Sequence, residues 1–191
     1  MSHLRSLLAC GLLLGATAGS ASAATFTFTG GDFNQIYGPP YTTADHVIGT
    51  ITLTAPLANQ RPLSDAFAIL HDLQFDDGHQ VRTYVAGQSF PDTFVCDIKL
   101  GTDLTGKINA WSIWLRETSV SQGSPQSSLE LYSGGNLHEQ VGQGNASNVV
   151  CGSIVLTNGA ARINLADASP WEAIPDGLIF RNGFEPPGSG Q

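Results

Sequence analysis

Short runs of alternating apolar and polar residues recur along this chain from Thr25 to Leu165. The run Thr25–Thr29 is the clearest, because an extended backbone places its two phenylalanines on one side and its threonines on the other. No window of about 12 residues in this range holds the 3.6-residue period of an amphipathic helix. The pattern therefore predicts an all-β fold.

Glycine, asparagine, proline and serine clusters separate the apolar runs and mark where each predicted strand ends. Asp77-Gly78 predicts a tight hairpin. Two longer runs predict core-facing stripes, one formed by Phe94, Cys96, Ile98 and Leu100, the other by Trp111, Ile113 and Leu115. The predicted strands lie within 25–29, 47–54, 67–75, 81–85, 94–100, 111–115, 129–132, 149–156 and 161–165.

Eight or nine short strands in one domain predict a two-sheet antiparallel β-sandwich, either jelly-roll-like or immunoglobulin-like. Two long, polar, glycine-rich stretches, Ser119–Ser128 and Ser133–Asn148, are predicted to be loops. Functional loops of sandwiches have this composition, and so do loops without a function.

The first 23 residues have the order of a cleavable signal peptide. A basic n-region ends at Arg5, an apolar segment spans Ser6–Ala18, and Ala21-Ser22-Ala23 fits the small-residue cleavage pattern. Leu7–Cys10 also fits a lipobox, but the apolar run continues through Leu14, which favours ordinary cleavage. We therefore expect a signal peptide at 1–23, a sandwich at 24–170, a tail at 171–191, and a secreted or periplasmic location.

Removal of the signal peptide leaves 7 basic and 16 acidic residues, a formal charge of −9. An acidic chain with scattered basic residues argues against nucleic acid as a partner. No later stretch has the length of a transmembrane segment. Cys10 leaves with the signal, so Cys96 and Cys151 are predicted to form a disulfide, the alternative being two buried free thiols.

One stretch of the chain resembles a known family. Tyr41–Leu53, Leu63-Ser64-Asp65, the Leu73–Gly78 strand that ends in Asp-Gly, and Ile108–Leu115 around a tryptophan are similar to landmarks of an uncharacterised family of exported bacterial domains. Many members of that family carry a PEP-CTERM anchor. The resemblance implies an exported β-sandwich and no known activity. This sequence departs from the family in that we find neither the membrane helix nor the basic tail of such an anchor in it.

The last residues carry a second resemblance. Gly177–Glu185 contains Ile179-Phe180-Arg181-Asn182-Gly183-Phe184-Glu185, which is similar to an Ile-Phe-x-x-Gly-Phe-Glu ending of exported gammaproteobacterial proteins. Such an ending implies a sorting or processing tag. The alternative is a final strand whose apolar residues pack on the core.

A cluster of acidic and histidine residues surrounds the predicted hairpin. Asp76 and Asp77 are the candidate metal ligands, and calcium is the one cofactor that their chemistry suggests. Alternation should direct His71 and Asp72 to opposite sides of a strand, which argues against a shared ion. Both aspartates also suit a turn that holds no ligand.

Catalytic motifs are weak in this sequence. The segment from His138-Glu139 has Gly142 where a zinc protease has its second histidine, and no Gly-x-Ser-x-Gly elbow occurs. Glu117 and Glu130 are the candidates for a glycosidase acid/base pair, with solvated strand ends as the alternative.

Three aromatic residues, Trp114, Tyr84 and Tyr132, fall out of phase with the apolar residues of their strands and are candidates for stacking on sugar rings. We expect a noncatalytic exported sandwich with a structural, adhesive or surface-binding role and with a polysaccharide or surface protein as its partner. The alternative is an extracellular carbohydrate-active enzyme or glycan-binding module.

Overall fold

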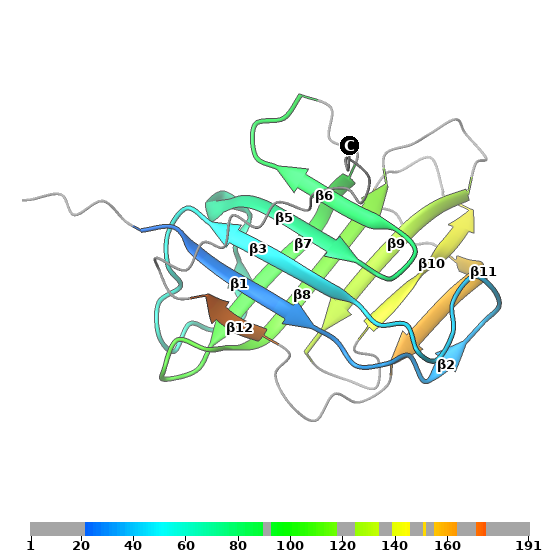
Figure 1. The fold of residues 1–191 in the computed structure, drawn as a ribbon. Coiled ribbons are helices and arrows are strands. Elements are labelled where there is room, and N and C mark those ends of the chain that lie inside the picture. Colours follow the sequence, from blue (N-terminus) through cyan, green and yellow to red (C-terminus); the bar gives the residue numbers. More distant parts are fainter. Residues whose placement is uncertain are drawn as a thin grey trace, which may run out of the picture.

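Alternating strands bury one side of each sheet, and here two antiparallel sheets stack to form a β-sandwich (Figure 1). The computed structural model describes residues 22–89, 93–117, 125–133, 139–145, 151, 155–163 and 171–174. The all-β prediction and the two-sheet prediction are confirmed.

The five-stranded sheet has the order β12-β1-β3-β5-β6 and forms the front layer in Figure 1. Its strands are β1 (Ala24–Thr29), β3 (Ile48–Leu53), β5 (Leu70–Asp76), β6 (Val81–Val85) and β12 (Trp171–Ile174). The turn between β5 and β6 contains Gly78 with a φ of +88°, the left-handed conformation that favours glycine. The predicted Asp77-Gly78 hairpin is therefore confirmed.

The seven-stranded sheet has the order β2-β11-β10-β9-β8-β7-β4 and forms the rear layer. Its strands are β2 (Gln35–Ile36), β4 (Ser64–Asp65), β7 (Thr93–Thr102), β8 (Ile108–Glu117), β9 (Pro125–Tyr132), β10 (Glu139–Asn145) and β11 (Val155–Ile163). A single 3-10 turn, η1 (Phe67–Ile69), precedes β5 in the described part of the chain.

Aromatic rings from both sheets meet in the core. Trp171 of β12 contacts Phe28 with ring centroids 5.0 Å apart and Trp111 of the other sheet at 6.3 Å. Gly49 of β3 lies between Phe28 of β1 and Phe75 of β5. A Cβ at Gly49 would clash with the Phe75 ring and come within 2.7 Å of the Gln74 carbonyl oxygen. The absence of a side chain at this position lets the rings approach the strand.

A buried ion pair joins the two sheets near β6. The Arg82 guanidinium donates to Asp77 at 2.7 Å and to the Ser127 hydroxyl of β9 at 3.2 Å. Asp77 also accepts from the Tyr41 hydroxyl at 2.9 Å. Both Arg82 and Asp77 are fully buried, and such charges require paired, hydrogen-bonded surroundings.

The predicted disulfide is confirmed. Cys96 and Cys151 are bonded with their Cα atoms 5.4 Å apart. Cys96 lies at a break in the β7–β8 register between Val95 and Asp97, whereas Cys151 lies between β10 and β11. The disulfide therefore links the connection between β10 and β11 to β7, and β9 and β8 lie between β10 and β7 in the sheet.

Several predicted strand boundaries were wrong. The described structure holds twelve strands, because two-residue strands such as β2 and β4 leave no periodic signal. Phe67–Ile69 forms the 3-10 turn, β10 lies inside the predicted 133–148 loop, and β9 begins inside the predicted 119–128 loop. Cys151 lies in a turn, so it interrupts the predicted 149–156 strand.

The stripe predicted for β7 was also wrong at its start. Ile98 and Leu100 face the core, but the register break at Cys96 reverses the phase before it, so Phe94 is exposed and Val95 packs toward the core. The stripe of Trp111, Ile113 and Leu115 is confirmed, since all three are buried.

The predicted end of the domain at residue 170 is too early, because Trp171–Ile174 pairs with β1 and Trp171 is buried. Nearly all of the predicted signal peptide and the 175–191 segment, with Cys10, Ile179, Phe180 and Phe184, lie outside the described residues. The described part of the chain contains no helix that could span a membrane.

Replacement of Asp77 by alanine should lower the free energy of unfolding by about 3–5 kcal/mol, because it leaves the buried Arg82 charge unpaired. Asp76→Ala is the matched control, since Asp76 only accepts from the Gly78 N–H at 2.8 Å and should cost about 1 kcal/mol or less. Urea unfolding followed by tryptophan fluorescence measures both values. Equal losses in the two variants would contradict the stabilising role of the ion pair.

Replacement of Cys96 and Cys151 together by serine should lower the free energy of unfolding by about 4 kcal/mol, because the bond closes a loop of 55 residues in the unfolded chain. Denaturant unfolding of the double variant tests this value. An unchanged midpoint would contradict it.

Candidate binding face

The outer side of the seven-stranded sheet carries polar and aromatic side chains in regular rows. Trp111, Ile113 and Leu115 of β8 point into the core, so the intervening residues of β8 point outward. The same alternation places Leu129 and Leu131 of β9 inside and their neighbours outside. We call this surface the Trp114 face: it is formed by Asp97, Lys99, Ser112, Trp114, Glu130 and Tyr132, and Arg116 and Ser128 lie on the same side of the sheet but are fully buried.

Strand register brings the members of the Trp114 face together across three strands. Trp114 lies between Asp97 of β7 and Glu130 of β9. In the next row, Ser112 lies between Lys99 and Tyr132. Residues directly opposite have Cβ atoms about 4.5–5.5 Å apart, and diagonal neighbours remain within reach of aromatic side chains. Trp114 and Tyr132 are such diagonal neighbours.

A chain of hydrogen bonds fixes the two aromatic side chains. The Trp114 indole N–H donates to the Ser128 hydroxyl at 3.2 Å, and that hydroxyl donates to Glu130 at 3.3 Å. The Tyr132 hydroxyl donates to the other Glu130 oxygen at 3.2 Å. Burial and the Glu130 charge raise the pKa of Tyr132 well above its ordinary value. Glu130 therefore fixes the positions of both rings.

Charged side chains flank the two rings. The Arg116 guanidinium carbon lies 5.2 Å from the centre of the Trp114 ring, a cation–π distance, and burial lowers the pKa of Arg116. On the other strand Asp97 accepts from the Ser112 hydroxyl at 2.6 Å and pairs with Lys99 at 2.8 Å. The hydrogen bond from the Lys99 ammonium to Asp97 and the charge of Asp97 raise the pKa of Lys99.

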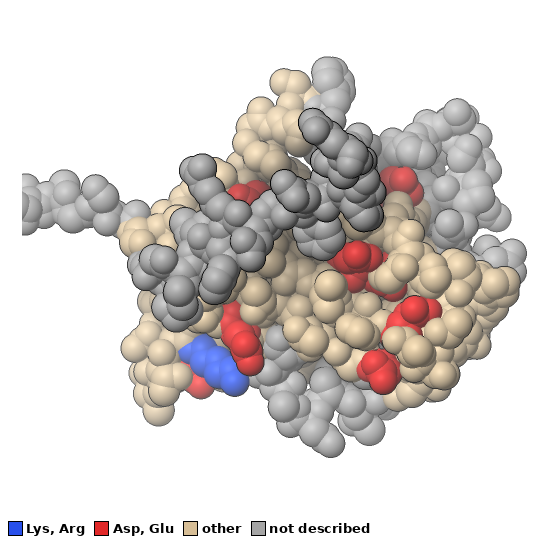
Figure 2. All heavy atoms as spheres, viewed as in Figure 1, with Lys and Arg blue, Asp and Glu red and all other residues tan. Residues whose placement is uncertain are grey.

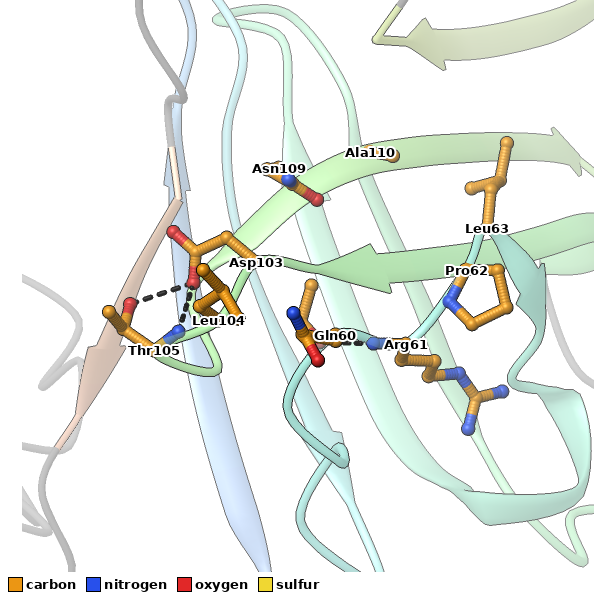
Figure 3. A pocket seen from close by; sticks show the side chains of 10 residues that line it. Gln60, Arg61, Pro62, Leu63, Asp103, Leu104, Thr105, Asn109 and Ala110 are labelled. Atoms are coloured by element: carbon orange, nitrogen blue, oxygen red, sulfur yellow. Dashed lines mark hydrogen bonds between the residues drawn. The ribbon is translucent and has the colours of Figure 1, made fainter.

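A groove of about 690 Å³ opens where β7 turns into β8 (Figure 3). One wall is the segment Gln60–Leu63, and the other is the turn Asp103–Thr105, with Asn109 and Ala110 of β8 between them. We call it the hairpin groove. Its volume lies within the range of about 300–1,000 Å³ typical of small-molecule sites.

The walls of the hairpin groove are held by local hydrogen bonds. Asp103 accepts from the Thr105 hydroxyl at 2.7 Å and from the N–H groups of Thr105 and Lys107 at 2.8 and 3.0 Å, and these bonds lower the pKa of Asp103. The Arg61 guanidinium donates to the carbonyl oxygens of Leu100 and Asp65 at 3.3 and 2.6 Å. These hydrogen bonds fix the shape of both walls of the groove.

The hairpin groove continues into the Trp114 face along β8. Ala110 lies between the groove walls, and Ser112 is the next outward residue of the same strand. Successive outward residues of a strand are about 6.6–6.8 Å apart. Leu104 and Leu63 at the rim of the groove are 69% and 46% exposed. An extended ligand could therefore contact the groove and the aromatic side chains together.

The two predicted acid/base residues do not face one another. Glu117 is in phase with the core-facing residues of β8, whereas Glu130 belongs to the outward residues of β9. They lie on opposite sides of one sheet, and a glycosidic bond cannot lie between them. Glu130 instead orients Trp114 and Tyr132.

The three predicted stacking aromatics divide in the same way. Trp114 and Tyr132 share the Trp114 face, but Tyr84 belongs to the inner side of the five-stranded sheet, where it contacts Phe67 with ring centroids 5.9 Å apart. The prediction for Tyr84 was wrong because Val81 and Val85, which looked like core residues, point outward and are exposed.

The candidate metal ligands in the β5–β6 hairpin already bond to other groups of the protein. Asp77 accepts from Arg82 and Tyr41 with one oxygen and from the N–H groups of His79 and Gln80 with the other. No cluster of three or more His, Cys, Asp or Glu residues suited to a metal occurs among the described residues.

His71 and Asp72 lie closer together than alternation predicted, with Nδ1 and Oδ2 2.6 Å apart. A register shift between Thr52 and Leu53 in the β3–β5 pairing places Leu70 and Leu73 in the core. His71 and Asp72, which lie between these two leucines, therefore both point to the outer side of the sheet.

Sequence reasoning missed much of this site. Asp97, Lys99, Ser112 and Ser128 alternate with core residues, as Trp114 does, so their outward direction was readable from the sequence. Their proximity was not, because it depends on which strands pair and in which register. The hairpin groove was missed because residues 60–63 and 103–110 are distant in sequence.

No known protein family, curated protein sequence or solved structure matches this chain. The resemblance to the exported bacterial domains therefore stays a prediction.

Figure 2 shows the opposite side of the molecule, the outer side of the five-stranded sheet. Acidic side chains are spread over its described residues, and blue for Lys or Arg is visible at one place only in this view.

Replacement of Glu130 by glutamine should lower the pKa of Tyr132, because the carboxylate charge that opposes tyrosinate formation is removed. A pH titration of tyrosinate absorbance measures the change, with Tyr132→Phe to identify the transition of Tyr132. An identical titration of the Glu130→Gln variant and the unmodified protein would contradict the contact.

Proposed function

We propose that this protein is a noncatalytic glycan-binding domain that works outside the cytoplasm and adheres to a polysaccharide through the Trp114 face. The observation that carries this proposal is the strand register, which makes Trp114 and Tyr132 neighbours. Glu130 accepts hydrogen bonds from Tyr132 and from Ser128, the residue to which Trp114 donates. Rigid aromatic side chains with polar neighbours suit sugars, whose rings have apolar C–H faces and polar hydroxyl edges.

The charged side chains of the face supply the second half of sugar recognition. A ring stacked between Trp114 and Tyr132 would bring its hydroxyls next to Asp97, Lys99 and Glu130, which together offer donors and acceptors. Asp97 already pairs with Lys99, and Glu130 already accepts from Ser128 and Tyr132, so their positions are set and less conformational entropy is lost on binding.

The hairpin groove supports an extended ligand rather than a single sugar. A polysaccharide chain that lies along β8 would pass from the aromatic pair over Ser112 and Ala110 to the groove between Arg61 and Leu104. Several weak contacts along one chain are a common basis for adhesion.

Binding without hydrolysis is favoured over the enzyme alternative. The two candidate carboxylates lie on opposite sides of the sheet, and both oxygens of Glu130 already accept hydrogen bonds from neighbouring side chains. The Cys96–Cys151 bond supports an oxidising location, which agrees with export by a signal peptide.

Replacement of Trp114 or Tyr132 by alanine should weaken binding to the recognised polysaccharide by about tenfold or more, because each removes a stacking surface worth at least about 1.4 kcal/mol. Cosedimentation with insoluble cellulose, chitin and xylan, and affinity electrophoresis with soluble glucans and alginate, identify the ligand and measure the loss. Tyr37→Ala is the matched control, because Tyr37 is an exposed tyrosine outside the face.

Leu104→Ala should weaken binding to long chains more than binding to short oligosaccharides, because only a long chain reaches the groove. Failure of the unmodified protein to bind any of these glycans would overturn the proposal. So would equal losses in Trp114→Ala and Tyr37→Ala, since binding would then not depend on the face.

A further inference from the structure

The outermost strand of the five-stranded sheet, β6, has an open edge. β6 pairs with β5, and no strand of the described residues pairs with it on the other side. In Figure 1 it is the uppermost strand of the front sheet. An open edge exposes backbone N–H and C=O groups that another strand can pair with.

The hairpin register determines which backbone groups this edge presents. The Asp77 N–H donates to the Gln80 carbonyl, and the Ala86 N–H donates to the His71 carbonyl, which fixes the alternation of hydrogen-bonded pairs between them. Arg82 and Tyr84 therefore bond toward β5. Val81, Thr83 and Val85 direct their N–H and C=O groups away from it, with the Val85 carbonyl engaged by the Gln88 N–H.

This edge lacks the features that normally prevent pairing. β6 has no proline and no register break, and its one charged side chain, Arg82, is buried in the core. Val81 and Val85 are instead 52% and 46% exposed. The edge strands of the other sheet, β2 and β4, have two residues each and are too short to pair in this way.

The exposed residues of β6 are arranged symmetrically about Thr83. If a second β6 lies antiparallel to the first with Thr83 opposite Thr83, Val81 of each copy lies opposite Val85 of the other. These positions are the ones whose backbone groups point to the open edge. All three side chains lie on the outer face of the sheet, so valine meets valine and threonine meets threonine, both favourable cross-strand pairs.

We propose that two copies of this chain pair through β6 and form a dimer with one continuous ten-stranded sheet. The twofold axis passes beside Thr83, which makes the interface self-complementary. The chain has a formal charge of −8, which opposes self-association, but the edge itself is uncharged. Asp72 and Asp76 lie on the adjacent strand β5 and are bonded to His71 and the Gly78 N–H.

Sedimentation velocity of the purified protein, from nanomolar to high micromolar concentration, tests the proposal. We expect a dimer whose fraction rises with concentration. Thr83→Pro should convert it to a monomer, because proline removes the central N–H of the edge without removing a bond to β5. A monomer at every concentration would overturn the proposal.

Val85→Lys is the second variant, because it places two charges in the interface and leaves the hairpin bonds intact. Ile48→Lys is its matched control, since Ile48 is 45% exposed on the same face but belongs to the central strand β3. Val85→Lys should dissociate the dimer and Ile48→Lys should not. Equal effects would overturn the proposal, and thermal unfolding verifies that each variant is folded.

Thr83→Cys supplies a positional readout. Two such cysteines would lie at the axis, so a short bismaleimide linker should join the copies efficiently, whereas Thr27→Cys on β1 should remain unlinked. Equal linking would overturn the proposal. The Trp114 face belongs to the other sheet, so Trp114→Ala should leave the dimer intact, which separates this interface from glycan binding.

Discussion

The buried contact between Asp77 and Arg82 fixes the β5–β6 hairpin and links it to the opposite sheet. Asp77 ends the β5–β6 hairpin, Arg82 lies on β6, and the guanidinium reaches across the core to Ser127 of β9. Tyr41, from the loop before β3, completes the network through its hydroxyl, and burial raises its pKa well above the ordinary value. A buried charge pair tolerates few alternative arrangements, because any that separates it leaves a charge without compensation.

The two sheets of the sandwich have different outer surfaces. The seven-stranded sheet carries the Trp114 face and the hairpin groove, whose side chains are held by bonds to Glu130, Asp97 and Asp103. The five-stranded sheet ends at β6, where Arg82 faces inward and leaves only valine and threonine outside. A polar face suits a polysaccharide, and an uncharged edge suits a second copy. The proposed activities therefore use separate surfaces of one core.

Irregularities in the strands decide details that strict alternation misses. The register break at Cys96 turns Phe94 outward and directs Asp97 toward Trp114 and Ser112. The shift between β3 and β5 brings His71 and Asp72 together on the outside. Each break adds a residue to one strand without a partner, and this reverses the direction of every side chain beyond it. Such a break depends on the paired strand, so a single strand's pattern does not reveal it.

The sequence by itself determined that the chain is all-β, that Asp77-Gly78 forms a hairpin, that Trp111, Ile113 and Leu115 face the core, and that Cys96 pairs with Cys151. These follow from local alternation, turn chemistry and an even cysteine count, which need no knowledge of distant partners. Only the tertiary structure decided that Glu117 and Glu130 lie on opposite sides of a sheet, that Tyr84 faces inward, and that Trp114 and Tyr132 are neighbours. The physical reason is that pairing and register are set by contacts between strands far apart in the chain.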